Sequence, residues 1–160
     1  MSNQKRTKLL ALDTSIKNTG FAVYLSGKLT RHGVISRKKT TTGADEMMCL
    51  LHDLIEKEKP DIVVVEMTVI VRNATTQREL TELIGSIRGH CLISDIYFYR
   101  IRPTEWRKLV KKPDEKLPKE RNGLKFWSIC TVKEKFGIEV KDDESDAILI
   151  GLAYIKMYEG

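Results

Sequence analysis

Cysteine is scarce in this sequence, and its three residues, Cys49, Cys91 and Cys130, are far apart in the chain. An odd number with such spacing excludes a disulfide framework and the paired spacing of a zinc motif. The chain also lacks any apolar run close to the ~18 residues that a membrane-spanning helix requires. Its first residues are polar and lack the apolar segment of a signal peptide. These absences predict a protein of the reducing cytoplasm with no membrane partner.

Histidine is also rare. His32, His52 and His90 do not have the spacing of metal ligands, and we expect none of them to have a partner acid. Charge, by contrast, is plentiful and unbalanced: 28 Lys and Arg against 22 Asp and Glu give a formal charge of +6. This excess permits a polyanionic partner without requiring one. With 41% hydrophobic residues, the 160-residue chain suffices for one domain with its own core, which we assign to residues 1–160.

Short β-rich runs alternate with segments of helical periodicity. The expected strands are residues 8–13, 20–25, 28–35, 61–66 and 95–101, and the expected helices are residues 44–59, 75–94, 103–110, 124–136 and a last one from residue 142. Thr42 and Asp45 have the spacing of a capping box before the first helix. The element order indicates a mixed α/β domain. A five-stranded sheet of order 3-2-1-4-5, with strand 2 antiparallel and helices flanking it, accommodates all five strands.

Two of the expected strands end in an acid. Asp13 closes the first strand and Glu66 closes the fourth. These strands are parallel neighbours in the expected sheet, so both carboxylates lie at the edge where ligands of open α/β sheets bind. Two unpaired carboxylates repel and raise each other's pKa, and a divalent cation would relieve that repulsion.

The last expected helix begins with four acids, Asp142, Asp143, Glu144 and Asp146. Asp143 and Asp146 are three positions apart and share one helix face. Acids here offset the helix dipole, or they supply ligands to a divalent-metal site. The strand-end acids favour the second interpretation: an all-oxygen catalytic site for two Mg²⁺ ions, with Mn²⁺ able to substitute. We expect the other two acids of the group to cap the helix or support the site from outside.

These motifs resemble those of the RuvC-type Holliday-junction resolvases, most of all their phage-borne branch. The similar segments are residues 10–23 (LALDTSIKNTGFAV), 63–66 (VVVE) and 143–147 (DESDA). The resemblance implies an RNase H-like fold, a homodimer and Mg²⁺-dependent cleavage of branched DNA, especially four-way junctions. It also implies that Asp13, Glu66, Asp143 and Asp146 are the catalytic metal ligands. Val69 stands where the family often has an aromatic residue, and no partner helicase is indicated.

Residues 100–125 concentrate positive charge, with ten Lys and Arg against four acids, a net charge of +6. Charge runs are usually solvated faces, but phosphate binding is favoured beside an acidic metal site. The resemblance adds that this region contacts the DNA backbone, with Arg107 and Lys119 the nearest matches. The candidate DNA-binding residues are Lys17, Asn18, Arg72, Arg78, Arg107, Lys108, Lys111, Lys112 and Lys119.

Other functions stay open at this point. The same fold could carry a nuclease for forks, flaps or RNA–DNA hybrids, because four acids do not distinguish these substrates. An actin-like sugar kinase is disfavoured, since 160 residues are too few for two such domains. A catalytically silent DNA-binding module is disfavoured, because an unused acid cluster only destabilises the fold. Trp106 and Trp127 are expected in the core, and the helix around residues 80–91 is the expected dimer surface.

Overall fold

Five strands form one mixed sheet, and their order across it is β3-β2-β1-β4-β5. In the computed structural model, which describes residues 6–67 and 73–159, the strands are β1 (Lys8–Asp13), β2 (Asn18–Leu25), β3 (Lys28–Ser36), β4 (Ile62–Glu66) and β5 (Tyr97–Ile101). The strands β1, β4 and β5 are parallel, whereas β2 is antiparallel to both of its neighbours. The predicted fold class and strand order are therefore confirmed.

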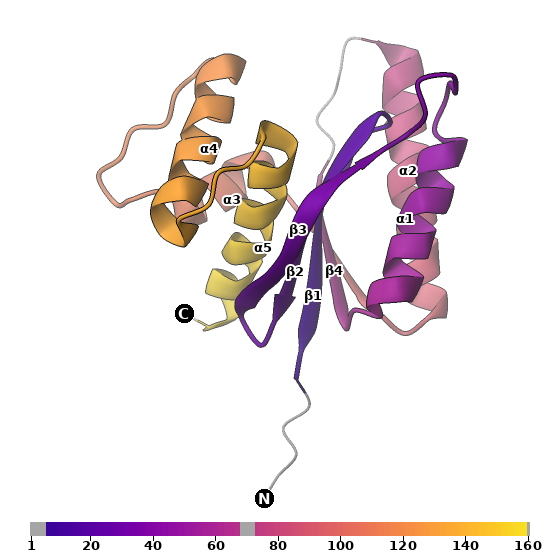
Figure 1. Cartoon of the computed structure of the whole chain (residues 1–160), viewed down its shortest axis with the longest axis horizontal. Coiled ribbons are helices and arrows are strands. Elements are labelled where there is room, and N and C mark those ends of the chain that lie inside the picture. The colour runs from indigo at the N-terminus through magenta and orange to yellow at the C-terminus, as the bar shows by residue number, and fades with distance from the viewer. Residues whose placement is uncertain (1–5, 68–72, 160) are drawn as a thin grey trace, which may run out of the picture.

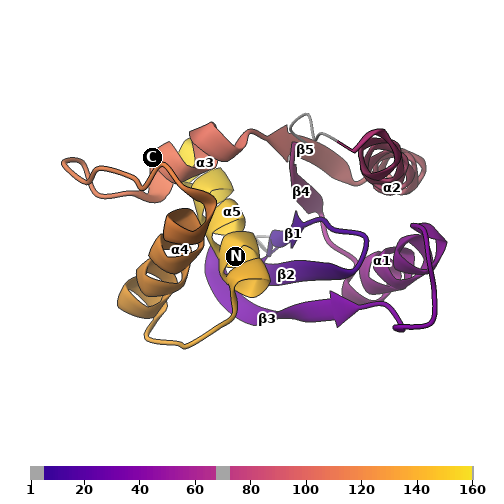
Figure 2. The same cartoon turned by 90° about the horizontal axis from the view of Figure 1, so that it is seen from above.

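Helices cover both faces of this sheet, as Figure 1 shows from the side and Figure 2 from above. They are α1 (Asp45–Glu58), α2 (Ala74–Ile93), α3 (Pro103–Val110), α4 (Arg121–Phe136) and α5 (Asp142–Glu159). The helices α1 and α2 lie on one face and α3, α4 and α5 on the other, which makes three layers. Within the described residues, none of these helices is long and apolar enough to span a membrane.

Alternating side chains of the central strand divide the core in two. Leu10 and Leu12 of β1 pack with the side chains of α1 and α2, whereas Leu9 and Ala11 pack with those of α3, α4 and α5. Burial on both faces explains why β1 is an almost continuous apolar run, as is typical of central strands in α/β sheets.

Helix α5 lies directly against the sheet, and residues 147–150 on it are fully buried. A Cβ atom added to Gly151 would lie 2.4 Å from the ring of Tyr24, so glycine allows the helix backbone to approach β2 closely. The Tyr24 hydroxyl donates a hydrogen bond of 2.6 Å to the backbone carbonyl of Ile148. These contacts fix α5 along β2 and thereby fix where its first turn lies.

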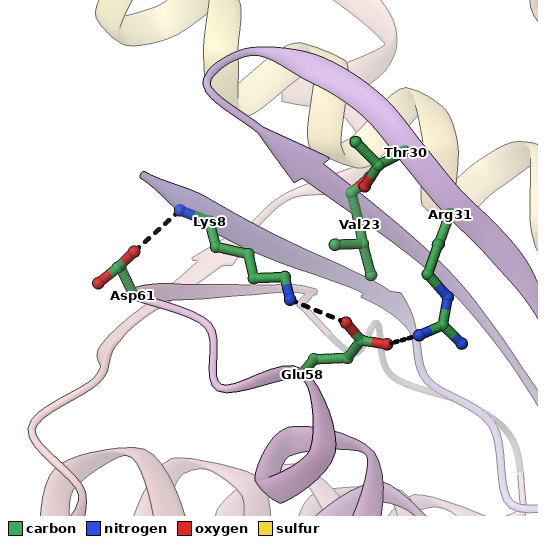
Figure 3. Close-up of polar contacts among 6 residues, drawn as sticks. All are labelled: Lys8, Val23, Thr30, Arg31, Glu58 and Asp61. Carbon is green, nitrogen blue, oxygen red and sulfur yellow. Dashed lines mark hydrogen bonds and ion pairs between the residues drawn. The ribbon is translucent and has the colours of Figure 1, made fainter. Parts of the chain in front are cut away.

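A polar cluster ties the amino-terminal end of β1 to the carboxyl-terminal end of α1 (Figure 3). The buried carboxylate of Glu58 lies 3.1 Å from Lys8 Nζ and also pairs with Arg31. The backbone N–H of Lys8 donates to Asp61 Oδ2 at 2.9 Å. This network joins β1, β3, the end of α1 and the start of β4.

Element boundaries differ from the predicted ones by up to three residues. Helix α4 begins at Arg121 rather than at residue 124, and β2 begins at residue 18 rather than 20. The predicted capping box is wrong: the N-cap residue of α1 is Ala44, which makes no side-chain cap hydrogen bond. The hydroxyl of Thr41 donates instead to Glu46 in the first helical turn, where the acid also offsets the positive end of the helix dipole.

Candidate active site

Asp13 and Glu66 end the neighbouring parallel strands β1 and β4. The register of these strands places both residues at the same edge of the sheet. The turn after Asp13 is fixed by Thr19, whose hydroxyl donates to the Ser15 carbonyl at 2.8 Å and accepts from the Ser15 N–H at 3.1 Å. The chain therefore returns as β2 directly beside the carboxylate of Asp13.

Gly20 brings a third element to this edge. It is paired with Asp13 across β1 and β2. A Cβ atom at this position would lie 1.9 Å from the backbone oxygen of Asp143, a distance that no side chain tolerates. Glycine therefore permits the first turn of α5 to lie against β2. That placement carries Asp143 and Asp146 toward the two strand ends.

The charges of the four acids act on one another. Burial raises the pKa of Asp13 well above its usual value, and the charges of Asp146, Glu66 and Asp143 raise it further. Burial likewise raises the pKa of Asp146 to about 6 and raises the pKa of Glu66. Burial and the neighbouring Asp142 raise the pKa of Asp143. The four predicted acids therefore lie near enough to one another at this edge of the sheet for the charges of three of them to raise the pKa of Asp13.

Two buried donors from α3 and α4 hold these carboxylates. Trp106 Nε1 donates to Glu66 Oε2 at 2.6 Å, and Ser128 Oγ donates to Asp146 Oδ1 at 2.6 Å. Both donors are fully buried, which confirms the core placement of Trp106. Each hydrogen bond opposes the rise in pKa that burial causes in its acceptor. Sequence reasoning did not find either pairing, because no sequence spacing joins a side chain of one helix to the end of a distant strand.

The remaining acids of the first turn of α5 have partners of their own. Lys125 Nζ lies 2.8 Å from Asp142 Oδ2 and holds the pKa of that carboxyl below its usual value. His32 Nδ1 lies 2.6 Å from Glu144 Oε1. Both acids are therefore engaged by residues of α4 and β3.

The expectation that the histidines lack partner acids is wrong. Besides the pair of His32 with Glu144, His90 Nε2 lies 2.8 Å from Glu56 Oε1. His90 Nδ1 also lies 2.8 Å from His52 Nδ1, between α1 and α2. The partners come from separate elements, so their proximity is invisible in the sequence.

No protein-family model matches the chain, and no curated protein matches its sequence. Solved structures do match. RuvC of Thermus thermophilus in complex with a Holliday junction substrate has a TM-score of 0.73 at 13% identity, over 96% of each chain. The fowlpox virus Holliday junction resolvase has a TM-score of 0.65 at 17% identity, over 94% of this chain and 99% of that one. The yeast mitochondrial Holliday junction resolvase has a TM-score of 0.61 at 15% identity, over 94% of this chain and 78% of that one. This chain has the RuvC fold.

The chemical type of the donor atoms at this edge of the sheet suits a hard divalent cation. All four acids offer carboxylate oxygens, which Mg²⁺ and Mn²⁺ prefer. As the side chains stand, no three His, Cys, Asp or Glu within residues 6–67 and 73–159 are gathered tightly enough to hold one ion. The mutual repulsion that raises the pKa of Asp13 works against closer approach, and a cation among the carboxylates would remove it.

Arg107, a candidate DNA-binding residue, lies beside the carboxylates of Glu66 and Asp146. Its guanidinium lies 4.9 Å from the ring centroid of Trp106. Its charge lowers the pKa of both Glu66 and Asp146. Its Nε atom is buried and has no hydrogen-bond partner in the described part of the chain. Arg107 therefore places a positive charge beside the carboxylates of Glu66 and Asp146.

The other candidate DNA-binding residues in residues 100–125 differ in whether their side chains already have a partner. Lys108 and Lys119 are exposed. Lys112 Nζ pairs with Glu134 at 2.7 Å, and Lys111 Nζ lies 3.3 Å from two backbone carbonyls. Among the described residues, Lys108 and Lys119 have no ion-pair partner, whereas Lys112 is paired with Glu134.

The remaining candidates lie outside that segment. Lys17, in the turn after Asp13, and Asn18, the first residue of β2, are both exposed. Asn18 Oδ1 accepts a hydrogen bond of 2.6 Å from Ser36. Arg78 is exposed on α2. Arg72 lies outside the described residues, as does Val69. The DNA-binding role of all of these residues stays a prediction.

Proposed function

We propose that this chain is a divalent-metal-dependent endonuclease that cleaves branched DNA, with four-way junctions as its preferred substrate. The observation that carries the proposal is the convergence of four acids at one edge of a RuvC-type sheet, where the charges of three of them raise the pKa of Asp13. Solved structures with this fold include RuvC and the fowlpox virus resolvase with Holliday junction DNA. Those complexes support the choice of substrate.

In this proposal the carboxylates of Asp13, Glu66, Asp143 and Asp146 hold two Mg²⁺ ions, or Mn²⁺ in their place. Two such ions, when bound, would activate the attacking water and stabilise the leaving oxygen of a phosphodiester, giving a 5′-phosphate and a 3′-hydroxyl. The chain itself presents the carboxylates on rigid strand and helix ends. The guanidinium of Arg107 adds positive charge beside them, which favours the approach of a phosphate.

We further propose a homodimer, because two sites related by a two-fold axis suit a symmetric junction. The exposed face of α2 is the proposed contact. Cβ atoms added to Gly85 and Gly89 would meet nothing within 4 Å, and Leu92 and Ile93 at the end of the helix are 68% and 90% exposed. Small residues beside exposed apolar ones allow another helix to approach closely.

The resemblance of the acidic motifs places the chain, in our proposal, in the phage-borne branch of the resolvases. Such a protein works in the cytoplasm, which is the host cytoplasm if a phage encodes it. The net charge of +6 over residues 100–125 supports a long contact with the DNA backbone.

The test uses labelled four-way, three-way, forked and linear DNA and an RNA–DNA hybrid, each incubated with Mg²⁺ or EDTA. We expect the wild-type protein to cleave the four-way junction faster than the other substrates, and to cleave it with Mg²⁺ but not with EDTA. We expect Asp146→Asn to lose cleavage, because the amide removes one anionic ligand. Linear duplex cut as fast as junctions would overturn the proposed substrate, and faster cleavage of the hybrid would favour the RNase H-like alternative.

A further inference from the structure

Two neutral donors at the acid cluster, Trp106 and Ser128, point to a function beyond core packing. We propose that they are positioning residues, each of which engages one oxygen of a carboxylate and so directs the other oxygen of Glu66 or Asp146 toward a divalent cation. The inference deepens the proposed function and rests on it for the use of the cation in cleavage.

The indole of Trp106 is held rigidly. Its side chain is fully buried, its ring stacks on Trp127 with centroids 6.2 Å apart and planes 30° apart, and Arg107 lies over it. An indole has a single N–H, and this one donates to Glu66 Oε2 at 2.6 Å. The locked ring therefore commits Oε2 and leaves Oε1 as the oxygen of Glu66 that is available to a cation.

Ser128 does the same for Asp146 from a different helix. It is fully buried on α4, and its hydroxyl donates to Asp146 Oδ1 at 2.6 Å. The bond leaves Oδ2 available. Two acids from separate elements, one on β4 and one on α5, are thus each met by a donor from the α3–α4 pair. Outer partners of this kind orient metal-binding carboxylates.

The neutrality of these donors matters. Asp142, in the same first turn of α5, is held by the ammonium of Lys125 at 2.8 Å, which offsets its charge. An indole N–H or a hydroxyl orients a carboxylate but leaves its negative charge for a cation. Glu66 and Asp146 thus accept hydrogen bonds from neutral donors, whereas Asp142 pairs with an ammonium.

The chain offers a matched control for each donor. Trp127 belongs to the same ring stack, yet its buried Nε1 atom has no hydrogen-bond partner among the described residues. Thr131, one turn beyond Ser128 on α4, is buried and donates to the backbone carbonyl of Trp127 at 2.7 Å rather than to an acid. Trp127→Phe and Thr131→Val therefore perturb the same core without touching a carboxylate.

The experiment titrates the metal-free, full-length protein with Mn²⁺ and follows free Mn²⁺ by electron paramagnetic resonance, in the absence of DNA. Trp106→Phe and Ser128→Ala should each lower the Mn²⁺ affinity by about tenfold. Trp127→Phe and Thr131→Val should stay within about twofold of wild type, and Ser128→Thr should restore the affinity, because it keeps the hydroxyl. Affinity for a four-way junction in EDTA should not change, whereas kcat in Mg²⁺ should fall for the first two variants at unchanged KM for the junction.

Circular dichroism and thermal melts establish that each variant is folded, and Ser128→Ala tests the idea even if Trp106→Phe does not fold. Wild-type Mn²⁺ affinity in both donor variants would overturn the inference, as would an equal loss in their matched controls. A tenfold loss in a protein that cleaves no DNA would uphold the inference and overturn the proposed function. Wild-type protein that binds no Mn²⁺ would overturn both.

Discussion

Gly20→Ala tests how the first turn of α5 is brought to the acids. The added Cβ atom would lie 1.9 Å from the backbone oxygen of Asp143 and 2.4 Å from its carbonyl carbon. Real Cβ atoms do not approach such atoms closer than 3.0 Å, so the helix start must retreat by about 1.1 Å, the difference between 3.0 and 1.9 Å. The obstacle is backbone, which cannot rotate away as a side chain can.

Overpacking of this kind costs about 1–3 kcal/mol, and each kcal/mol lowers the Tm of a chain of this size by about 2–4 °C. The effect on cleavage should be larger than the effect on stability. A catalytic group displaced by about 1 Å costs on the order of 100-fold in rate, and here Asp143 and Asp146 both move away from Asp13.

The assay compares Tm, Mn²⁺ affinity and the rate of junction cleavage in Gly20→Ala, with Gly33→Ala on the neighbouring strand as the control. A Cβ atom at Gly33 would lie 2.9 Å from the ring edge of Phe21, a side chain that can shift. The control should therefore lose some stability but keep its rate at temperatures below its Tm. If Gly20→Ala cleaves junctions at the wild-type rate, Gly20 does not set the position of α5 and the reasoning fails.

Three further predictions concern charge. The pKa of Asp146 is about 6 in the folded protein against 3.8 ordinarily, so the native state keeps a proton that the unfolded state loses between these values. The free energy of unfolding of the metal-free protein should therefore fall as pH rises from about 4 to about 6. Asp146→Asn should remove up to about 3 kcal/mol of that fall, measured by urea unfolding in EDTA. The same dependence of unfolding free energy on pH in wild type and variant would contradict this. Glu58→Gln should cost about 2 kcal/mol of stability, because Lys8 and Arg31 lose their anionic partner, and it should leave cleavage intact; a lost rate in folded protein would refute it. Lys119→Ala should reduce the salt dependence of junction binding by about 0.9 in the log–log slope, whereas Lys112→Ala should reduce it less, because Glu134 already holds that ammonium; the reverse order in salt titrations would be inconsistent with this account.

The sequence predicts the sheet well because the decisive patterns are local. An apolar run ending in Asp13, the two-residue turn at Ser26 and Gly27 and the β-branched run ending in Glu66 each fix an element from its own residues. Both turn residues have positive φ, of 50° and 80°, as a tight hairpin requires. With strand order and direction predicted, the meeting of two acids at one sheet edge follows without any tertiary information.

The contacts around those acids could not be predicted in the same way. Trp106 and Glu66 are 40 residues apart, and His32 and Glu144 are 112 apart. Their pairing depends on where α3 and α5 pack on the sheet, which helical periodicity does not specify. The role of Gly20 was equally hidden, because a glycine in a strand shows its purpose only when the backbone that approaches it is known.

The most direct test of the central claim is the rate of four-way junction cleavage in Mg²⁺ by the wild-type protein and by Asp13→Asn. The charges of the other three acids all raise the pKa of Asp13, so its amide variant should be at least as stable as the wild type without metal. We predict paired nicks by the wild-type protein and a loss of cleavage in a fully folded Asp13→Asn. Cleavage by Asp13→Asn at the wild-type rate would contradict the assignment of this cluster as the active site.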